Sequence, residues 1–165
     1  MEIQLIRHKE ISSKDIMRAV SLKSVAWPYP VDSQLKWISD NMTPDDMHVF
    51  LTEEGIDMGY MTLSPVKGIL NGCSASFMGV GCVCSAKPGN GMGRQLVMSV
   101  NRYLFENDYK GLLFCKAGLI GFYSKCGWEV VEKEKVNIPI DTTSIFIMVY
   151  NCPSIKSIEY DGRMF

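Results

Sequence analysis

Apolar and polar residues alternate at the start of the chain and again through its middle, and this two-residue period predicts β-strands. The first strand covers Met1–Leu5, and runs rich in strand-forming residues begin again at Met47. The turn signals Glu54-Gly55 and Asn71-Gly72 separate these later runs, so we expect an antiparallel meander of three strands. The strands predicted for the meander are Met47–Glu53, Ile56–Ser64 and Cys73–Ser85.

Apolar residues recur at helical spacing in the segments on either side of the meander. Ahead of it, Ser12 followed by Asp15 resembles a capping box and predicts a helix over residues 13–25. The prolines of the segment 26–30 end this helix, and Asp32 or Ser33 is expected to cap a second one. Two short helices should therefore flank an aromatic, proline-stiffened elbow.

After the meander, helices and strands alternate. We expect a helix over 93–106, a strand over 111–116, a short helix over 119–126, and strands over 128–132 and 144–150. A strand–helix–strand crossover implies a parallel pairing within the sheet. The pattern therefore predicts a single α+β domain, residues 1–165, with a mixed sheet.

Charge, hydropathy and cysteine content argue against several classes of function and location. The formal net charge is −1 and the charges form no long block, which argues against nucleic-acid or anionic-membrane partners. No apolar run reaches the roughly 18 residues of a membrane span, and no secretory leader is recognised, so we expect a cytoplasmic protein. Cysteines in such a compartment favour core packing over disulfides or a metal site, and no metal is expected. The cysteines are Cys73, Cys82, Cys84, Cys115, Cys126 and Cys152.

The segment Gly79–Leu96 combines an apolar run, three closely spaced glycines and the start of a helical pattern. We expect the helix to begin at Gly93 or Arg94, directly after the glycines. The first turn of a helix presents unpaired N–H groups and partial positive charge, so this turn is a candidate phosphate site. A purely structural strand-to-helix turn explains the glycines equally well.

The order of elements resembles the GCN5-related N-acetyltransferase (GNAT) superfamily, and three motifs carry the resemblance. The segment 88–93 (PGNGMG) resembles the acyl-CoA loop Q/R-x-x-G-x-G/A, and Gly81-Cys82-Val83 resembles the V-A-V triplet that precedes this loop. The segment 122–128 (FYSKCGW) resembles F-Y-x-x-x-G-F. The resemblance implies a mixed sheet of about six to seven strands flanked by about four helices, with acetyl-CoA as co-substrate.

The resemblance also implies roles for individual residues. Tyr123 would protonate the departing thiolate; simple packing of this aromatic under the sheet is the alternative. Backbone amides of the loop would hold the CoA pyrophosphate, and Cys82 and Val83 would pair with the pantetheine arm. Pro88 replaces the usual Arg or Gln, for which Lys87 could compensate. The implied CoA-binding residues are Cys82, Val83, Lys87, Gly89, Asn90, Gly91, Met92, Gly93 and Arg94.

The sequence specifies the acetyl acceptor less well than it specifies the CoA site. In the aminoglycoside 2'-N-acetyltransferase branch an acid precedes the triplet, whereas this chain has Gly79 there, so no general base is identified. Segments 46–49, 143–148 and 159–165 nevertheless resemble that branch, and the nodulation acyltransferases share the strand pattern. Candidate acceptor-binding residues are Trp27, Tyr29, Asp161 and Phe165. Core packing of the two aromatics and a packed or frayed end of the chain are the alternatives.

The function expected from these features is direct transfer of an acetyl group from acetyl-CoA to a primary amine of a small molecule, such as an aminoglycoside or amino sugar. No cysteine stands beside a histidine partner, which disfavours a covalent intermediate. A protein or peptide N-acetyltransferase and a non-catalytic CoA-binding module are the alternatives. The sequence leaves open whether the chain forms a homodimer. His48, a lone histidine in a strand, is expected to be a structural residue.

Overall fold

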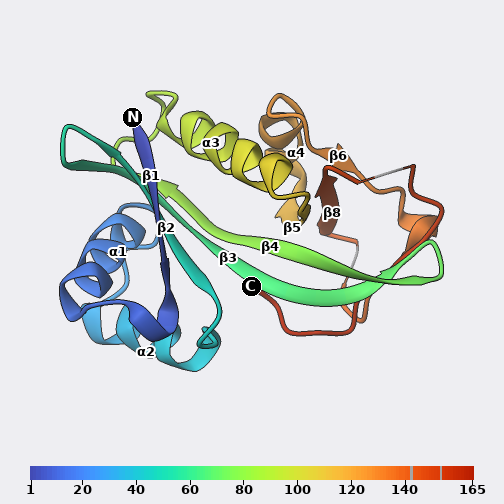
Figure 1. The fold of residues 1–165 in the computed structure, drawn as a ribbon, viewed down its shortest axis with the longest axis horizontal. Coiled ribbons are helices and arrows are strands. Elements are labelled where there is room, and N and C mark those ends of the chain that lie inside the picture. The colour runs from blue at the N-terminus through green and yellow to red at the C-terminus, as the bar shows by residue number, and fades with distance from the viewer. Residues whose placement is uncertain (142, 153) are drawn as a thin grey trace. The chain divides into compact units, whose positions relative to one another are not determined.

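A computed structural model describes residues 1–141, 143–152 and 154–165. The chain forms two compact units. Unit 1 comprises Met1–Ser64, Gly81–Val100 and Phe165, and unit 2 comprises Pro65–Val80 and Asn101–Met164. Strands β3 (Ile56–Leu70) and β4 (Cys73–Ser85) and helix α3 (Met92–Glu106) each contribute residues to both units (Figure 1). The single domain over residues 1–165 stays a prediction.

Unit 1 contains an antiparallel meander with two helices. Strand β1 (Glu2–Arg7) pairs with β2 (Met47–Glu53), and β2 pairs with the first half of β3. A 3-10 turn over His8–Glu10 follows β1, and helices α1 (Ser13–Ala26) and α2 (Val31–Asn41) lie between β1 and β2 in the chain (Figure 1).

The starts of the two helices show how the local sequence is used. Ser12 caps α1 as predicted, because its Oγ accepts a hydrogen bond from the Asp15 N–H at 3.1 Å. Helix α2 begins earlier than expected, at Val31. Pro30 takes the cap position, with φ −53°, and its carbonyl accepts from the Gln34 N–H at 3.1 Å. Proline is pre-organised for a helix start, so the helix needs no side-chain cap from Asp32 or Ser33.

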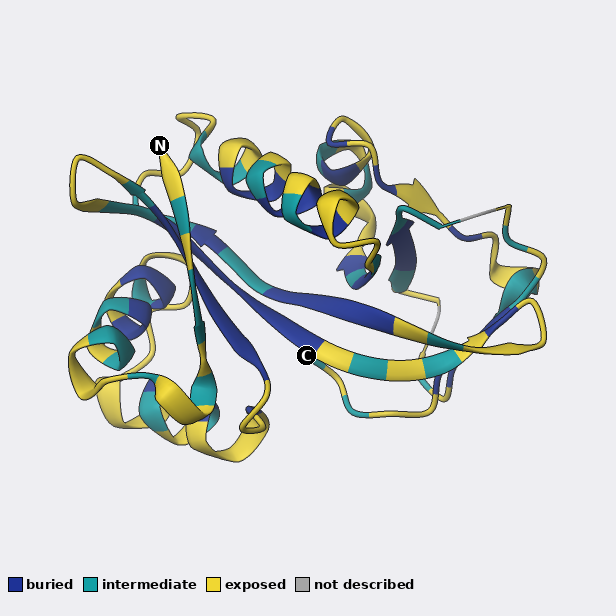
Figure 2. Ribbon diagram, viewed as in Figure 1, coloured by how far each residue is buried: buried dark blue, intermediate teal, exposed yellow. Residues whose placement is uncertain are grey.

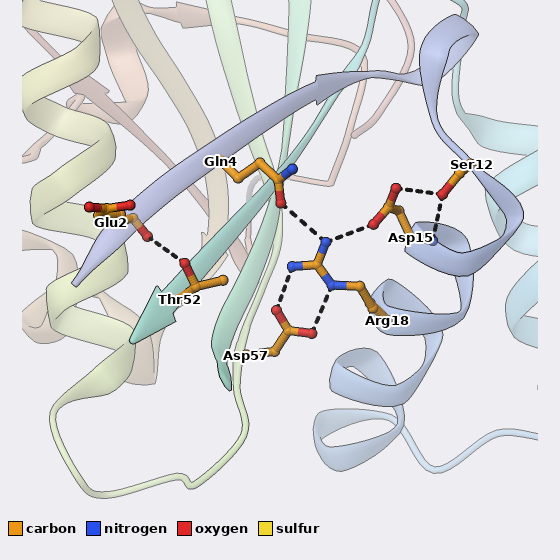
Figure 3. A network of polar contacts seen from close by, with 7 residues as sticks. All are labelled: Glu2, Gln4, Ser12, Asp15, Arg18, Thr52 and Asp57. Atoms are coloured by element: carbon orange, nitrogen blue, oxygen red, sulfur yellow. Dashed lines mark hydrogen bonds and ion pairs between the residues drawn. The ribbon is translucent and has the colours of Figure 1, made fainter. Parts of the chain in front are cut away.

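Arg18 anchors α1 to the sheet of unit 1 (Figure 3). Its Nη2 and Nε donate to the two carboxylate oxygens of Asp57 on β3, at 2.6 and 2.9 Å. Its Nη1 donates to Asp15 at 2.7 Å and to Gln4 of β1 at 3.1 Å. The guanidinium also lies 4.2 Å from the ring centroid of buried Phe50. A bidentate arginine–carboxylate pair fixes orientation as well as distance, so α1 is held in one rotational setting over the strands.

Unit 2 contains the parallel pairing that the crossover implied. The first half of β4 runs parallel to β5 (Lys110–Lys116), with Gly79 opposite Leu112. Strand β5 pairs antiparallel with β8 (Ile145–Tyr150), and β8 pairs with the short β6 (Glu129–Val130). Helix α4 (Ala117–Ser124) follows β5, and a 3-10 turn covers Lys133–Lys135. In the part of the chain that the structure describes, the predicted mixed sheet and the four α-helices are confirmed.

The strands differ from the predicted ones in three places. Strand β3 continues past Ser64 to Leu70, through Pro65. The pairing with β2 ends at Leu63, so the missing proline N–H costs no hydrogen bond to β2. Near the end of the chain, β9 (Ile158–Glu159) pairs with the end of β3 and with β7 (Val136–Asn137), and neither of these two short strands was predicted. The predicted strand over 128–132 shortens to β6.

Helix α3 is amphipathic, with a buried stripe along one side (Figure 2). The buried residues are Leu96, Val97, Val100, Asn101 and Leu104, which repeat at helical spacing. Asn101 is the polar member of this stripe. Its Nδ2 donates to the Cys126 carbonyl at 2.6 Å, and its Oδ1 accepts from the Trp128 indole N–H at 2.9 Å. Within unit 2, this side chain therefore joins α3 to the segment that follows α4.

Replacing Asn101 with leucine is expected to lower the free energy of unfolding by about 1–3 kcal/mol, because it removes the acceptor of the buried Trp128 indole N–H and the hydrogen bond from Asn101 to the Cys126 carbonyl. Denaturant unfolding measures the change. Asn107→Ala is the matched control, because the Asn107 amide also bonds a backbone carbonyl, that of Tyr103 at 2.8 Å, but at an exposed position. Equal losses in the two variants would contradict a buried role for Asn101.

Candidate functional site

The glycine loop of unit 1 lies between β4 and α3 (Figure 1). Gly89 and Gly91 have φ values of 87° and 76°, in the left-handed region. A Cβ added at either position would meet no atom within 4 Å, so backbone conformation and not crowding calls for glycine there. Helix α3 begins at Met92, one residue earlier than predicted, and the Gly91 carbonyl accepts from the Gln95 N–H at 3.0 Å.

The loop is exposed and is anchored at its start. The Ala86 N–H donates to the Met58 carbonyl of β3 at 3.0 Å, and the following residues, 87–91, are exposed. The first turn of the 15-residue helix α3 comes directly after them. Its unpaired N–H groups and its dipole give the exposed loop the chemistry of an anion site.

Cys82 interrupts the regular conformation of β4. Its φ is 51°, a left-handed value that costs a non-glycine residue on the order of 1–3 kcal/mol. The neighbouring Gly81 is crowded: a Cβ there would lie 2.6 Å from the main-chain carbonyl carbon of Phe165 and 3.0 Å from Thr62 Oγ1. The kink therefore lies in the triplet 81–83 that the sequence singled out, and in unit 1 Phe165 lies directly beside it.

A cavity of about 260 Å³ in unit 1 opens beside this kink. Trp27 and Tyr29, both predicted acceptor residues, line it together with Cys82. Gln34 holds the elbow in place, because its buried amide donates to the Trp27 carbonyl at 2.6 Å. The lining residues are Lys23, Trp27, Tyr29, Ser33, Gln34, Trp37 and Cys82.

Lys23 is the lining residue that sequence reasoning missed. It lies in the last turn of α1, where a lysine is normally solvated, yet only 4% of it is exposed. Its Nζ lies 3.7 Å from the ring centroid of Trp37 on α2. No local sequence signal distinguishes it, since its burial depends on α2 packing over it.

Tyr123 lies in unit 2, near the end of α4, and only 7% of it is exposed. Its ring makes an edge-to-face contact with Trp128, at 6.3 Å between centroids, and its carbonyl accepts from the Trp128 N–H at 3.1 Å. Burial raises the pKa of the Tyr123 hydroxyl to about 12, so the group is protonated at neutral pH. The packing of the ring and a role as proton donor are therefore compatible.

The other predicted site residues have the following environments. Lys87, Asn90 and Arg94 are exposed, Val83, Met92 and Gly93 are half-buried, and Lys87 to Arg94 are contiguous around the loop. Asp161 belongs to unit 2, where it lines a cavity with Asn137 and Tyr160 among others. Among the described residues, no cluster of three or more His, Cys, Asp or Glu side chains is placed to hold a metal ion, and no helix is long and apolar enough to cross a membrane.

His48 lies at the centre of a buried chain of hydrogen bonds in unit 1. Its Nε2 lies 3.0 Å from His8 Nδ1, and its Nδ1 lies 2.8 Å from the Tyr60 hydroxyl. His48 and Tyr60 are fully buried, and burial is the main cause that lowers the pKa of His48 to about 4. The contacts agree with the structural role expected for this histidine.

Stability should consequently fall on acidification between about pH 6.5 and pH 4. The pKa of His48 is lower in the folded chain than its ordinary value of 6.5, so the unfolded chain binds more protons in this window. We expect a loss of about 3 kcal/mol in the free energy of unfolding from this group. Denaturant unfolding at several pH values measures it, and His48→Asn should flatten the dependence. Equal slopes in wild type and variant would contradict the assignment.

Comparison with solved structures identifies the fold. An acyl-CoA N-acyltransferase from Pseudomonas aeruginosa aligns with a TM-score of 0.60 at 17% identity, over 91% of this chain and 99% of that one. The GNAT-family N-acetyltransferase YhbS from Escherichia coli, in complex with CoA, gives 0.65 at 19% identity, over 97% and 89%. An aminoglycoside 6'-N-acetyltransferase complexed with coenzyme A gives 0.66 at 14% identity, over 93% and 99%.

No protein-family model matches the sequence, and no curated protein matches it. The chain thus has the acyl-CoA N-acyltransferase fold, and the resemblance to the GNAT superfamily that the motifs indicated is confirmed at the level of the fold.

Proposed function

We propose that the chain is an acetyl-CoA-dependent N-acetyltransferase that acetylates a primary amine of a small molecule. One observation carries the proposal. In a chain of this fold, the Cys82 kink, the left-handed glycine loop and the start of α3 follow one another directly. Two structural neighbours of the chain are complexes with coenzyme A, which supports acetyl-CoA as the co-substrate.

In this proposal the loop binds the pyrophosphate of CoA. Backbone N–H groups from Gly89 to Arg94 supply the hydrogen bonds, and the partial positive charge of α3 adds to them. Pro88 offers no side-chain contact, so the backbone provides most of the affinity, with the exposed Lys87, Asn90 and Arg94 at its margin. Met92 and Gly93 contribute through their main chains.

The triplet 81–83 would hold the thioester. Main-chain groups of Cys82 and Val83 pair with the pantetheine arm, and an N–H there donates to the thioester oxygen. Negative charge develops on this oxygen during attack, so one fixed donor is worth about 10²- to 10³-fold in rate. The kink at Cys82 turns main-chain groups out of the regular strand geometry, so in this proposal the strained conformation frees them to bind the thioester.

The transfer itself is direct. The deprotonated amine nitrogen attacks the thioester carbonyl carbon, a C–N bond forms, the C–S bond breaks, and Tyr123 protonates the departing CoA thiolate. The amine proton leaves to water, and the Tyr123 oxygen takes up a proton from water to restore the starting state. Burial raises the pKa of Cys82 and raises that of Cys84 to about 12, so neither thiol is a ready nucleophile, which supports a route without an acyl-enzyme.

The cavity lined by Trp27 and Tyr29 is the proposed acceptor site, and its volume of about 260 Å³ suits a small molecule. Asp161 and Phe165 stay candidate acceptor contacts. One structural neighbour is an aminoglycoside enzyme, so aminoglycosides and amino sugars are acceptors to be tested.

Acetyl-CoA binding by calorimetry, combined with thiol release across an amine panel, tests the proposal. The panel contains aminoglycosides, amino sugars, simple amines, amino acids and peptides with free N-termini. Thiol release with small amines is the expected result. Release with peptides alone would indicate a peptide N-acetyltransferase, and tight binding without release on any amine would indicate a non-catalytic CoA-binding module.

A further inference from the structure

The cavity of unit 1 contains a buried cation without a counter-charge. Among the described residues, Lys23 Nζ has no hydrogen bond and no ion pair, and its close neighbour is the face of Trp37. Removing an ammonium from water is costly unless an anion or several acceptors replace the hydration shell. The face of Trp37 gives Lys23 a cation–π contact, and the Nζ atom is not sealed from the cavity, since none of the fully buried side-chain nitrogens in the described part of the chain lacks a partner. An anion that enters the cavity can therefore take the place of the water around this ammonium.

The charge pattern of the cavity disfavours a strongly cationic occupant. Of the described residues that line it, Lys23 is the only charged one, and the others are aromatic or neutral polar side chains. A polycationic aminoglycoside would meet a buried positive charge with no carboxylate beside it. An occupant with one negative charge would complete the site.

A carboxylate fits this site better than a phosphate group. One ammonium balances one negative charge, whereas a phosphate monoester carries about −1.5 to −2 at neutral pH. The cavity volume of about 260 Å³ suits a small molecule, and the rings of Trp27 and Trp37 can cover its apolar part. Burial lowers the pKa of Lys23, and a bound carboxylate would offset that effect by stabilising the charged amine.

We propose that the acceptor is a small amine that also carries one carboxylate, and that Lys23 binds this carboxylate within the cavity of unit 1. The inference rests on the proposed function, because it takes the bound amine to be the acetyl acceptor. The binding of a carboxylated amine at Lys23 can nevertheless be measured by itself. Lys23 is then a specificity-determining residue, and the acetyl transfer proceeds at the opposite, amine end of the bound molecule.

The experiment compares amino acids with their decarboxylated amines, for example L-phenylalanine with phenethylamine and 4-aminobutyrate with propylamine. Thiol release gives kcat/KM for each. Wild type should prefer the carboxylated member of a pair, and Lys23→Met should lower its kcat/KM by roughly ten- to hundred-fold while leaving the neutral amine unaffected. The control is Lys36→Met, which removes an exposed lysine of α2 that pairs with Asp40.

A second readout separates the inference from the proposed function. Titration of the same amino acids in the presence of CoA, followed by intrinsic fluorescence, reports binding because Trp27 and Trp37 line the cavity. Binding that Lys23→Met weakens at least tenfold, without any thiol release, would support the inference and overturn the proposed function.

Three results would overturn the inference and leave the proposed function standing. The first is equal turnover of carboxylated and neutral amines by the wild type. The second is an equal loss on both classes in Lys23→Met, which would indicate that Lys23 acts on the amine itself. The third is turnover restricted to aminoglycosides.

Discussion

Replacing Tyr123 with phenylalanine is expected to lower kcat by about 10²-fold, because the proposed proton donor of the departing CoA thiolate is removed. The hydroxyl has a pKa of about 12, so it is protonated at working pH and available as a proton donor. The KM for acetyl-CoA should stay within about twofold, because the change touches the reaction step and not the loop. Steady-state kinetics of thiol release measures both quantities.

Phenylalanine keeps the ring contact with Trp128, so Tyr123→Phe should fold normally, and a melting curve checks this. Tyr109→Phe is the matched control, since Tyr109 is an exposed tyrosine of the same unit. Unchanged kcat in Tyr123→Phe would remove this residue from the mechanism and leave it with its packing role alone.

Replacing Gly91 with valine should weaken CoA binding by at least tenfold. Gly91 has a φ of 76°, and a β-branched residue in that conformation costs on the order of 1–3 kcal/mol, enough to move the loop out of the shape proposed to bind the pyrophosphate. Calorimetric titration with CoA measures the affinity, and titration with adenosine diphosphate isolates the pyrophosphate contribution.

Gly72→Val is the control for backbone strain. Gly72 has a φ of 79° and an added Cβ there also meets nothing within 4 Å, but it belongs to the turn between β3 and β4 in unit 2. It should lower stability by a similar amount and leave CoA affinity unchanged. Similar CoA affinities for the Gly91 variant and wild type would contradict a phosphate-binding loop.

Local signals in the sequence predicted the elements that depend on neighbouring residues. The Ser12 cap, the meander turns and the order β4, glycine loop, α3 follow from side chains within a few positions of one another, and α3 began within one residue of its prediction. The continuation of β3 through Pro65 was missed because the pairing of its end with β9 joins residues far apart in the chain.

The features of the candidate site likewise fall into two groups, those that local sequence predicts and those that depend on tertiary packing. The glycine loop and the aromatic elbow with Trp27 and Tyr29 could be predicted, since motif and proline pattern are local. The left-handed conformation of Cys82 could not, because the surrounding structure imposes it on a residue that does not favour it. Nor could the burial of Lys23, which depends on the packing of α2 and Trp37 against α1.

Mass spectrometry of a reaction with acetyl-CoA carrying a ¹³C-labelled acetyl group tests the central claim most directly. The protein is mixed with labelled acetyl-CoA and the amine panel, and both the amines and the intact chain are weighed. Labelled acetyl on a small amine, with equimolar free CoA and an unlabelled protein, is the predicted result. Label retained on the protein, or labelled acetyl-CoA left intact with every amine, would contradict direct acetyl transfer by this chain.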